Sequence, residues 1–210
     1  MPGRNIEDIL REEYFSLLPE IRRVAWQLET EIRYFTLPVL QKLNHYEQLV
    51  VRSRVKDCES AIKSLRRRQE GRVFDPLRPT AYSLLSLPDL AGVRVLIFPR
   101  ARLMEADRLL ADRFTAWIPD PVPDEAGITL APKYSGYCAD VSARIRAEYQ
   151  VVPMLIGLFW EVEHSAMYKP SPSLVGMANS REMKLLKSEV EFALSRFEAV
   201  FENFVTENNN

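Results

Sequence analysis

The sequence predicts an α/β protein of one domain with helical extensions at both ends, and three features predict it. Apolar residues recur every three or four positions near both termini, as in helices with one buried side. The run 93–98, VRVLIF, is apolar apart from Arg94, as in a strand at the centre of a sheet. Residues 141–151 alternate apolar and polar side chains, as in a half-buried strand or hairpin. The chain is therefore expected to contain both helices and strands.

The first helix is expected over residues 6–35, where a single apolar stripe runs from Tyr14 to Phe35. Pro19 is expected to begin a fresh helix within this stretch, and Leu37-Pro38 to break it. A second helical segment then leads into residues 50–68, VVRSRVKDCESAIKSLRRR. A helical projection of that stretch separates an apolar side from a cationic side, with Ser53 as a candidate N-cap.

The stretch from Arg52 to Arg68 carries a local charge of +5 in a chain whose net charge is −1. A charge run on a helix is usually a solvated face, and that interpretation stays open. Serine among aligned lysines and arginines is also the donor set that binds oligophosphates.

Shorter secondary-structure elements are expected in the middle of the chain. Residues 71–88 are expected to form a loop with a short helical turn, and residues 101–114 a helix whose inward residues are Leu103, Leu109, Leu110 and Phe114. The proline-rich connection 117–133 is long for a compact domain, which indicates either disorder or a function. The polar side of 141–151 is either a solvated face or part of a site.

Two helices are expected to end the chain. One begins at Pro153 and continues to about Tyr168, and Asn179 with Glu182 forms a candidate capping box for the last. The last helix carries an apolar stripe suited to self-association or to packing on its own domain: Met183, Leu186, Val190, Ala193, Phe197, Val200 and Phe204.

The composition excludes several classes of partner and site. A net charge of −1 gives no support for duplex nucleic acid, and the longest apolar run, 154–160, is too short to span a membrane. The N-terminus lacks the apolar segment of a signal peptide, and two widely spaced cysteines favour the reducing cytoplasm. The histidines, His45 and His164, offer no metal-site spacing, and the motifs of P-loop, Rossmann and GxSxG chemistry are absent.

Two acids at predicted strands remain, Asp89 and Glu148, together with the cationic stretch. Two carboxylates that hold Mg²⁺ beside a group of phosphate-binding cations are the minimum needed for phosphoryl transfer. Asp89 enters the strand through the turn PDLAG, and an acid that only caps this turn is the alternative.

Five segments in order carry a resemblance: VRSRVKDCESAIKSL, DLAGVRV, KYSGY, EYQ and EVEHSAMYK. The stretch from Tyr46 to Lys169 resembles the RelA/SpoT synthetase domain, in the length class of the small alarmone synthetases. The resemblance implies a mixed β-sheet flanked by helices, related to nucleotidyltransferases. It divides the chain into N-terminal helices (1–45), a synthetase core (46–170) and a C-terminal helix (171–210).

The resemblance also implies roles for individual residues. Arg54 and Arg94 would sandwich the adenine of ATP, and its phosphates would be bound by Lys56, Ser60, Lys63 and Arg67. Asp89 and Glu148 would be catalytic and bind the cofactor Mg²⁺, with Glu148 as base for the acceptor hydroxyl. The acceptor would be bound by Lys133, Tyr137 and Gln150.

The departures from the family pattern all lie on the acceptor side. Cys138 and Val141 stand where an arginine and a histidine are common, Val152-Pro153 replaces an Arg-Thr pair, and Gly157 replaces an Asn or Asp. The donor-side residues are retained.

The resemblance therefore implies a pyrophosphokinase that transfers pyrophosphate from ATP to the 3′-hydroxyl of a guanosine nucleotide, the alarmone reaction of the stringent response. The depleted acceptor side leaves two alternatives: transfer to an adenosine nucleotide or a tRNA 3′ end, as in toxic relatives, or an ATP-binding module without turnover. Expected partners are ATP and a nucleotide acceptor. Assembly through the terminal helices and binding of a protein antitoxin stay open.

Overall fold

The architecture is a mixed five-stranded sheet between two layers of helices. The computed structural model describes residues 5–75, 77–123, 129–164, 175–178 and 180–208. The strand order is β1-β2-β7-β6-β3, in which β2 and β7 are parallel and the other neighbours antiparallel. The strands are β1 (Gln48–Val55), β2 (Ala91–Phe98), β3 (Ile118–Pro119), β6 (Lys133–Tyr137) and β7 (Arg146–Pro153), with a separate ribbon of β4 (Val122–Pro123) and β5 (Thr129–Ala131). The expected mixed sheet flanked by helices is confirmed.

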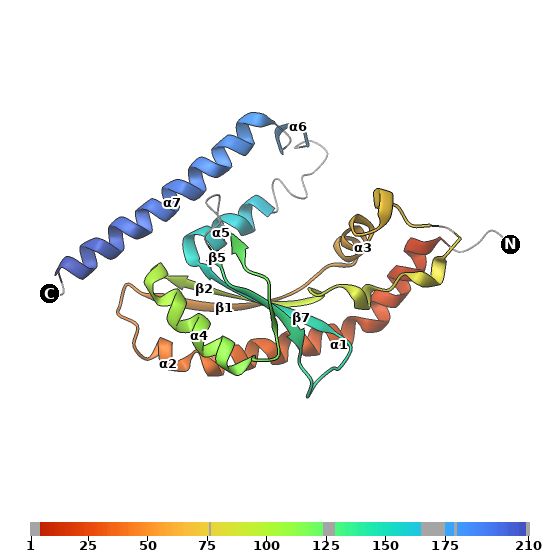
Figure 1. The fold of residues 1–210 in the computed structure, drawn as a ribbon, viewed down its shortest axis with the longest axis horizontal. Coiled ribbons are helices and arrows are strands. Elements are labelled where there is room, and N and C mark those ends of the chain that lie inside the picture. The colour runs from red at the N-terminus through yellow and green to blue at the C-terminus, as the bar shows by residue number, and fades with distance from the viewer. Residues whose placement is uncertain (1–4, 76, 124–128, 165–174, 179, 209–210) are drawn as a thin grey trace.

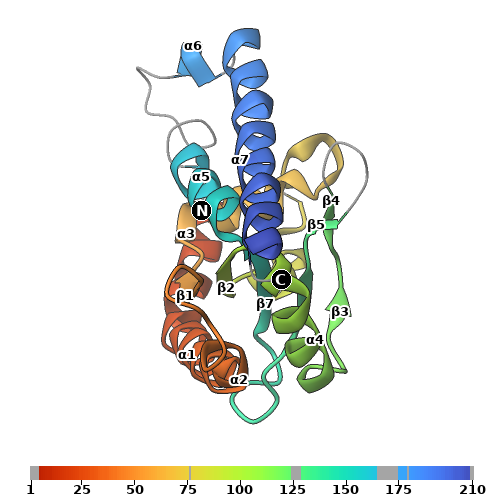
Figure 2. The ribbon, with the colours of Figure 1, turned by 90° about the vertical axis from the view of Figure 1, so that its left-hand side faces the viewer.

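The helices divide between the two faces of the sheet (Figure 1). Those of the described residues are α1 (Ile6–Phe35), α2 (Leu37–Leu40), α3 (Cys58–Arg67), α4 (Leu103–Arg113), α5 (Met154–Glu163), α6 (Val175–Ala178) and α7 (Arg181–Asn208). The view in Figure 2 places α1 and α4 on one side of the sheet, and α5 and α7 on the other. One face of the sheet is thus packed on α1 and α4, and the other lies under α5 and α7.

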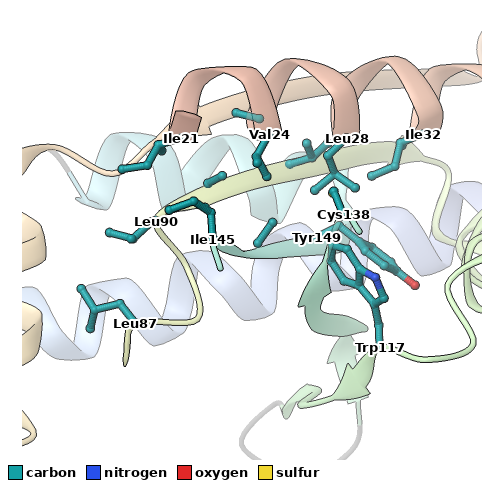
Figure 3. Close-up of a cluster of buried hydrophobic side chains, with 14 of the residues drawn as sticks. Ile21, Val24, Leu28, Ile32, Leu87, Leu90, Trp117, Cys138, Ile145 and Tyr149 are labelled. Atoms are coloured by element: carbon teal, nitrogen blue, oxygen red, sulfur yellow. The ribbon is translucent and has the colours of Figure 1, made fainter. Parts of the chain in front are cut away.

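The main core lies between α1 and the sheet. Ile21, Val24, Leu28 and Ile32 of α1 are buried against the sheet, where Tyr149 is also buried (Figure 3). Tyr149 stacks on Tyr134 with ring centroids 4.9 Å apart and contacts Trp117 and Phe114. This aromatic cluster joins β6 and β7 to the end of α4.

The expectation that Pro19 begins a new helix is wrong, because α1 is continuous from Ile6 to Phe35. Proline inside a helix costs about 3 kcal/mol through a lost hydrogen bond and a clash. Tyr14 and Leu17 before Pro19, and Ile21 and Val24 after it, are all buried. Burial of each such side chain contributes about 1.5–3 kcal/mol, so the packing outweighs the cost of the proline.

The expected helix over 50–68 is also wrong in its first half. Residues 48–55 form β1, which pairs with β2 along its whole length, and helix α3 starts only at Cys58. The N-cap is Asp57, whose carboxylate accepts the Ser60 N–H at 2.9 Å. Ser53, the expected N-cap, lies in β1 and donates its hydroxyl to Glu29 of α1. The valines of this stretch suit a strand, and pairing with the buried β2 decides the matter.

The alternating segment 141–151 is a strand only from Arg146 onward. Before it the chain turns, because the Ser142 hydroxyl accepts the Ile145 N–H at 2.9 Å and the Arg144 N–H at 3.2 Å. Arg144 forms an ion pair with Glu20 of α1 at 2.6 Å. The first residues of the alternating pattern therefore belong to the turn between β6 and β7.

The remaining expectations agree with the structure in most respects. Short 3₁₀ turns occupy the loop after α3, namely Glu70–Arg72, Pro79–Ala81 and Leu84–Ser86, and α4 follows the turn Arg100–Arg102. The proline-rich connection contains β3, β4 and β5, while residues 124–128 lie outside the described residues. The end of the helix predicted to reach Tyr168 and the capping residue Asn179 also lie outside them.

The apolar stripe of the last helix is mostly exposed in this chain. Leu186, Phe197, Val200 and Phe204 are each more than 40% exposed. Towards its C-terminal end, α7 contacts the domain through Phe201, which packs on Phe98 and Tyr46, and through Glu202, whose carboxylate accepts the Ala101 N–H at 2.6 Å. Packing on its own domain therefore uses only part of the helix.

Candidate active site

The sheet face under α5 and α7 forms the floor of a cleft of about 1150 Å³. Strand register places side chains in three rows across β1, β2 and β7. The first row is Val50, Leu96 and Val152; the second is Arg52, Arg94 and Gln150; the third is Arg54, Gly92 and Glu148. Because alternate residues of a strand face the same way, the three rows share one face. The second and third rows line the cleft and make its floor charged, whereas the apolar first row lies beside the cleft.

Beside the cleft, the apolar row forms a small buried cluster under helix α5. Leu96 and Val152 are buried there with Met154, and Trp160 of α5 packs on this cluster. The indole N–H of Trp160 donates to Glu191 of α7 at 2.8 Å. Phe192 of α7 also lines the cleft.

The second row is a network of charges. Glu161 of α5 lies 3.0 Å from Arg52 and 3.9 Å from Arg94. Arg94 also donates to the Gln150 side-chain oxygen at 3.3 Å. Burial lowers the pKa of Arg94, and the nearby charge of Arg54 lowers it further. Arg54 and Arg94 are thus two like charges close together at one place in the cleft.

The two predicted catalytic carboxylates lie close enough to influence each other. Burial raises the pKa of Glu148, and the negative charge of Asp89 contributes to the rise, while Lys133 and Arg54 oppose it. Glu148 accepts a hydrogen bond from the Gln150 amide at 2.8 Å. A buried carboxylate of raised pKa beside cations is suited to accept a proton near neutral pH.

The two carboxylate oxygens of Asp89, at the entry of β2, have different surroundings. One carboxylate oxygen, Oδ2, pairs with Lys56 at the end of β1 and lies 4.0 Å from Arg54. The other, Oδ1, is buried and has no hydrogen-bond partner among the described residues. A buried carboxylate oxygen without a partner is costly unless a ligand or cation binds it, so this atom fits a divalent cation.

The expected phosphate-binding residues separate into two groups. Lys56 pairs with Asp89, and this pair, although it does not line the cleft, borders Arg54, which does. Ser60, Lys63 and Arg67 follow one another on one side of α3, and none of them lines the large cleft. The Ser60 hydroxyl donates to Asp57 at 2.7 Å as part of the N-cap, whereas Lys63 and Arg67 are exposed.

The expected acceptor residues continue the floor onto β6 and β7. Lys133 pairs in register with Gln150 and forms an ion pair with Asp120. Tyr137 is 46% exposed, and the Arg146 guanidinium lies 6.0 Å from its ring centre. A half-exposed aromatic ring is able to stack on a base.

The positions that depart from the family pattern are packing positions in this chain. Gly157 has no room for a side chain, since a Cβ there would lie 2.3 Å from Leu96 and 3.3 Å from Val152. Cys138 is buried, and Val141 packs on the main core. Apolar packing therefore occupies the places where the family pattern has polar acceptor residues.

Sequence reasoning missed several residues of the cleft. Arg52, Trp160 and Glu161 line it, and α7 contributes Lys187 and Phe192. The sequence did contain a signal that Arg52 accompanies Arg54. The two residues are two positions apart, so they share a face if the segment is a strand. The helices α5 and α7 meet the cleft only through tertiary packing, which no local pattern reports.

Within the described residues there is no group of three or more His, Cys, Asp or Glu side chains suited to a metal ion. A cation at the cleft would therefore rest on the two carboxylates and on bound ligands. The described part of the chain contains no helix with the length and hydrophobicity needed to cross a bilayer.

Comparisons with known proteins identify solved structures that share this fold. No protein-family model and no curated protein matches the sequence. The chain has the fold of small alarmone synthetase 1 from Bacillus subtilis in complex with its product pppGpp, at 17% identity and a TM-score of 0.69, covering 95% of this chain and 100% of that one. The same enzyme bound to AMPCPP aligns with a TM-score of 0.65, at 17% identity over 93% of this chain and 97% of that one.

A GTP pyrophosphokinase family protein from Streptococcus pneumoniae aligns at 18% identity with a TM-score of 0.60, covering 93% of this chain and 96% of that one. The resemblance drawn from the five sequence segments is thus confirmed for the fold.

Proposed function

We propose that this protein is an ATP-dependent pyrophosphokinase that transfers pyrophosphate to the 3′-hydroxyl of a guanosine nucleotide. The observation that carries the proposal is a group of charges on the cleft floor, where Glu148 lies with Arg54 and Arg94 and where the Asp89–Lys56 pair borders Arg54. The similar Bacillus subtilis enzyme was solved with AMPCPP and with pppGpp, which supports ATP as donor and a guanosine nucleotide as acceptor.

The proposed step is an in-line displacement at the β-phosphorus of ATP. Glu148 accepts the proton of the 3′-hydroxyl as that oxygen bonds to the β-phosphorus, the bond between the α–β bridging oxygen and the β-phosphorus breaks, and AMP leaves. The raised pKa of Glu148 makes it a stronger base than an exposed glutamate. Lys56 and Arg54 supply positive charge close to Asp89, where the triphosphate would lie.

We propose Mg²⁺ as the cofactor, held by Asp89 and Glu148. The unpartnered Oδ1 of Asp89 and the repulsion between the two carboxylates both fit a cation at this place. When bound, Mg²⁺ would neutralise charge on the transferred phosphates. Lys63 and Arg67 would extend the positive charge beyond Lys56 along α3, and Ser60 would offer a hydroxyl to the phosphates.

The protein is proposed to act in the cytoplasm, the compartment that supplies its nucleotides. Cys58 and Cys138 are both free thiols, which suits a reducing compartment. Lys133, Tyr137 and Gln150 would hold the acceptor, with its base stacked on the exposed ring of Tyr137.

A second candidate is transfer to a different acceptor, an adenosine nucleotide or a tRNA 3′ end. The observation that favours it is the apolar packing at Cys138, Val141, Val152 and Gly157. A chain that kept the donor side and filled the usual acceptor positions would bind ATP and select another hydroxyl, or would bind ATP without transferring it.

The test is transfer from β-³²P-labelled ATP, with Mg²⁺, to a panel of GDP, GTP, ADP, ATP and tRNA. The proposal expects a labelled product with GDP or GTP, and loss of at least a hundredfold in rate for Glu148→Gln. Product on tRNA or an adenosine nucleotide alone would replace the guanosine assignment. ATP binding without product on any acceptor would leave only a binding module.

A further inference from the structure

The cleft contains a group of apolar side chains that the proposed chemistry does not use. All of them line the cleft: Val122, Pro123 and Leu130 of the β4–β5 ribbon, Trp160 of α5 and Phe192 of α7. We call these five residues the apolar compartment. Phe192 is 69% exposed even though it lines the cleft. A ligand that covers so large an apolar surface gains binding energy, so the compartment is suited to an apolar or aromatic group.

Phe192 does not belong to the exposed apolar stripe of α7. Each residue turns a helix by about 100°, so Phe192 lies about 140° around the helix from Phe197, a member of that stripe. Ser188 and Ser195 lie within about 60° of Phe192 and line the cleft with it. The exposed ring of Phe192 is therefore a feature of the cleft.

The ribbon side of the compartment is separated from the proposed donor side by Glu148. Arg54 and Arg94 are on β1 and β2, whereas Glu148 is on β7, the next strand. The ribbon flanks β7 on the side away from β2, where the Val151 N–H donates at 2.9 Å to the carbonyl of Pro132, the residue after β5. In Figure 2, α7 is seen between α5 and this ribbon. A ligand against the ribbon therefore has Glu148 between itself and the two arginines.

Tyr137, the ring expected to stack on the acceptor base, does not line this cleft. It pairs with Arg146, two residues before Glu148 on β7, and Arg146 does not line the cleft either. Among the described residues, the phenylalanine, tyrosine and tryptophan side chains that do line it are Trp160 and Phe192. The Trp160 indole packs on the small apolar cluster and donates to α7, whereas most of Phe192 is exposed. Phe192 is therefore the ring that the cleft offers to a ligand.

We propose that the apolar compartment binds the nucleobase of the acceptor nucleotide, stacked on the ring of Phe192. Every nucleobase has a π-face that stacks on an aromatic ring, and the ribbon supplies apolar contact. The hydroxyls of Ser188 and Ser195 both donate and accept hydrogen bonds, which suits the polar edge of a nucleobase. This inference rests on the proposed function, and it moves the acceptor nucleobase from Tyr137 to a ring inside the cleft.

The experiment measures binding of GDP by calorimetry in the presence of Mg²⁺ and saturating AMPCPP, an ATP analogue. Phe192→Ala is expected to weaken GDP by about tenfold or more through lost stacking, and Phe192→Trp is expected to stay within about twofold because it keeps an aromatic ring. The affinity for AMPCPP alone is expected to stay within about twofold in both variants. Tyr137→Ala is expected to weaken GDP less than Phe192→Ala does.

Phe197→Ala is the matched control. Phe197 lies on the same helix and is 55% exposed, but it does not line the cleft. Its removal is expected to leave the affinities for GDP and AMPCPP within about twofold. An equal loss of GDP affinity in the two alanine variants of α7 would show that the helix and not the Phe192 ring matters, and the inference would be wrong.

Three other results would overturn the inference: unchanged GDP affinity in Phe192→Ala, an equal loss for GDP and AMPCPP, or a larger loss in Tyr137→Ala. Binding of GDP that needs Phe192 in a chain without transfer would remove the proposed function and leave the nucleobase site standing. Transfer to GDP with a KM for GDP that Phe192→Ala does not raise would keep the proposed function and overturn the site.

Discussion

The environment of Glu198 in α7 predicts that the stability of the folded chain depends strongly on pH. Its side chain is 1% exposed, and neither carboxylate oxygen has a hydrogen-bond partner among the described residues. Burial raises its pKa from 4.5 to about 7, repulsion from Glu202 adds to the rise, and Arg100 opposes it. The perturbation is Glu198→Gln, which keeps the shape and removes the ionisation.

The sign follows from proton binding. Below pH 4.5 the carboxyl is protonated in both the folded and the unfolded chain, so ionisation costs nothing. Between pH 4.5 and about 7 the unfolded chain is ionised and the folded chain is not, so stability falls as pH rises. At about 1.4 kcal/mol for each unit of pKa, the full cost above pH 7 is about 3 kcal/mol.

The assay is urea unfolding of the unaltered chain and of Glu198→Gln at pH 5 and pH 8, with Glu189→Gln on the exposed side of α7 as a matched control. The Glu198 variant is expected to exceed the unaltered chain by about 1 kcal/mol at pH 5 and by about 3 kcal/mol at pH 8. Hydrogen exchange along α7 would show whether the gain is confined to this helix. A Glu198 variant that is less stable than the unaltered chain at pH 8 would refute the reasoning.

Three further predictions concern the cleft. Gly157→Asn, which introduces the residue type that the resembled family commonly has there, is expected to lose about 1–3 kcal/mol of stability by overpacking against Leu96 and to leave the choice of acceptor unchanged; a gain in guanosine transfer would contradict this. Lys56→Ala removes the cation paired with the part-buried Asp89 carboxylate and is expected to cost about 3 kcal/mol of stability in urea unfolding. Adding Asp89→Asn should recover this stability but not the transfer activity. If stability does not recover, the Lys56–Asp89 pair is unimportant for stability. The transfer rate should fall on the acid side at a pH above the ordinary glutamate value of 4.5, because burial raises the pKa of the base Glu148; an acid limb at or below 4.5 in a pH–rate profile would exclude Glu148 as that base.

Several elements could be predicted from the sequence because their signal is local. The buried strand β2 follows from its apolar run, and α1 follows from a stripe long enough to outweigh Pro19. Asp89 and Arg94 stood out as candidate site residues because they flank and interrupt that strand. The order of five short segments was enough to identify the fold, which the structural comparisons confirm.

Residues 48–57 could not be assigned from the sequence alone. Their valines and arginines suit either a helix with two sides or a strand with two faces, and the charge pattern does not distinguish them. Pairing with β2 over eight positions decided for the strand. That choice puts Arg52 and Arg54 on one face and moves Ser53 to the other.

The sequence by itself determined the buried strand, the long helices and the residue types available for chemistry, because hydrophobic periodicity and side-chain chemistry are properties of neighbouring residues. Only the tertiary structure decided that Arg54, Gly92 and Glu148 form one row, since strand register joins segments about forty and ninety residues apart. It also decided that side chains around Gly157 leave no room for a Cβ, and that the buried Glu198 carboxylate has no hydrogen-bond partner in the described part of the chain. The physical reason is that burial and proximity arise from contacts between distant segments, and these contacts set both the space for a ligand and the charge of the groups around it.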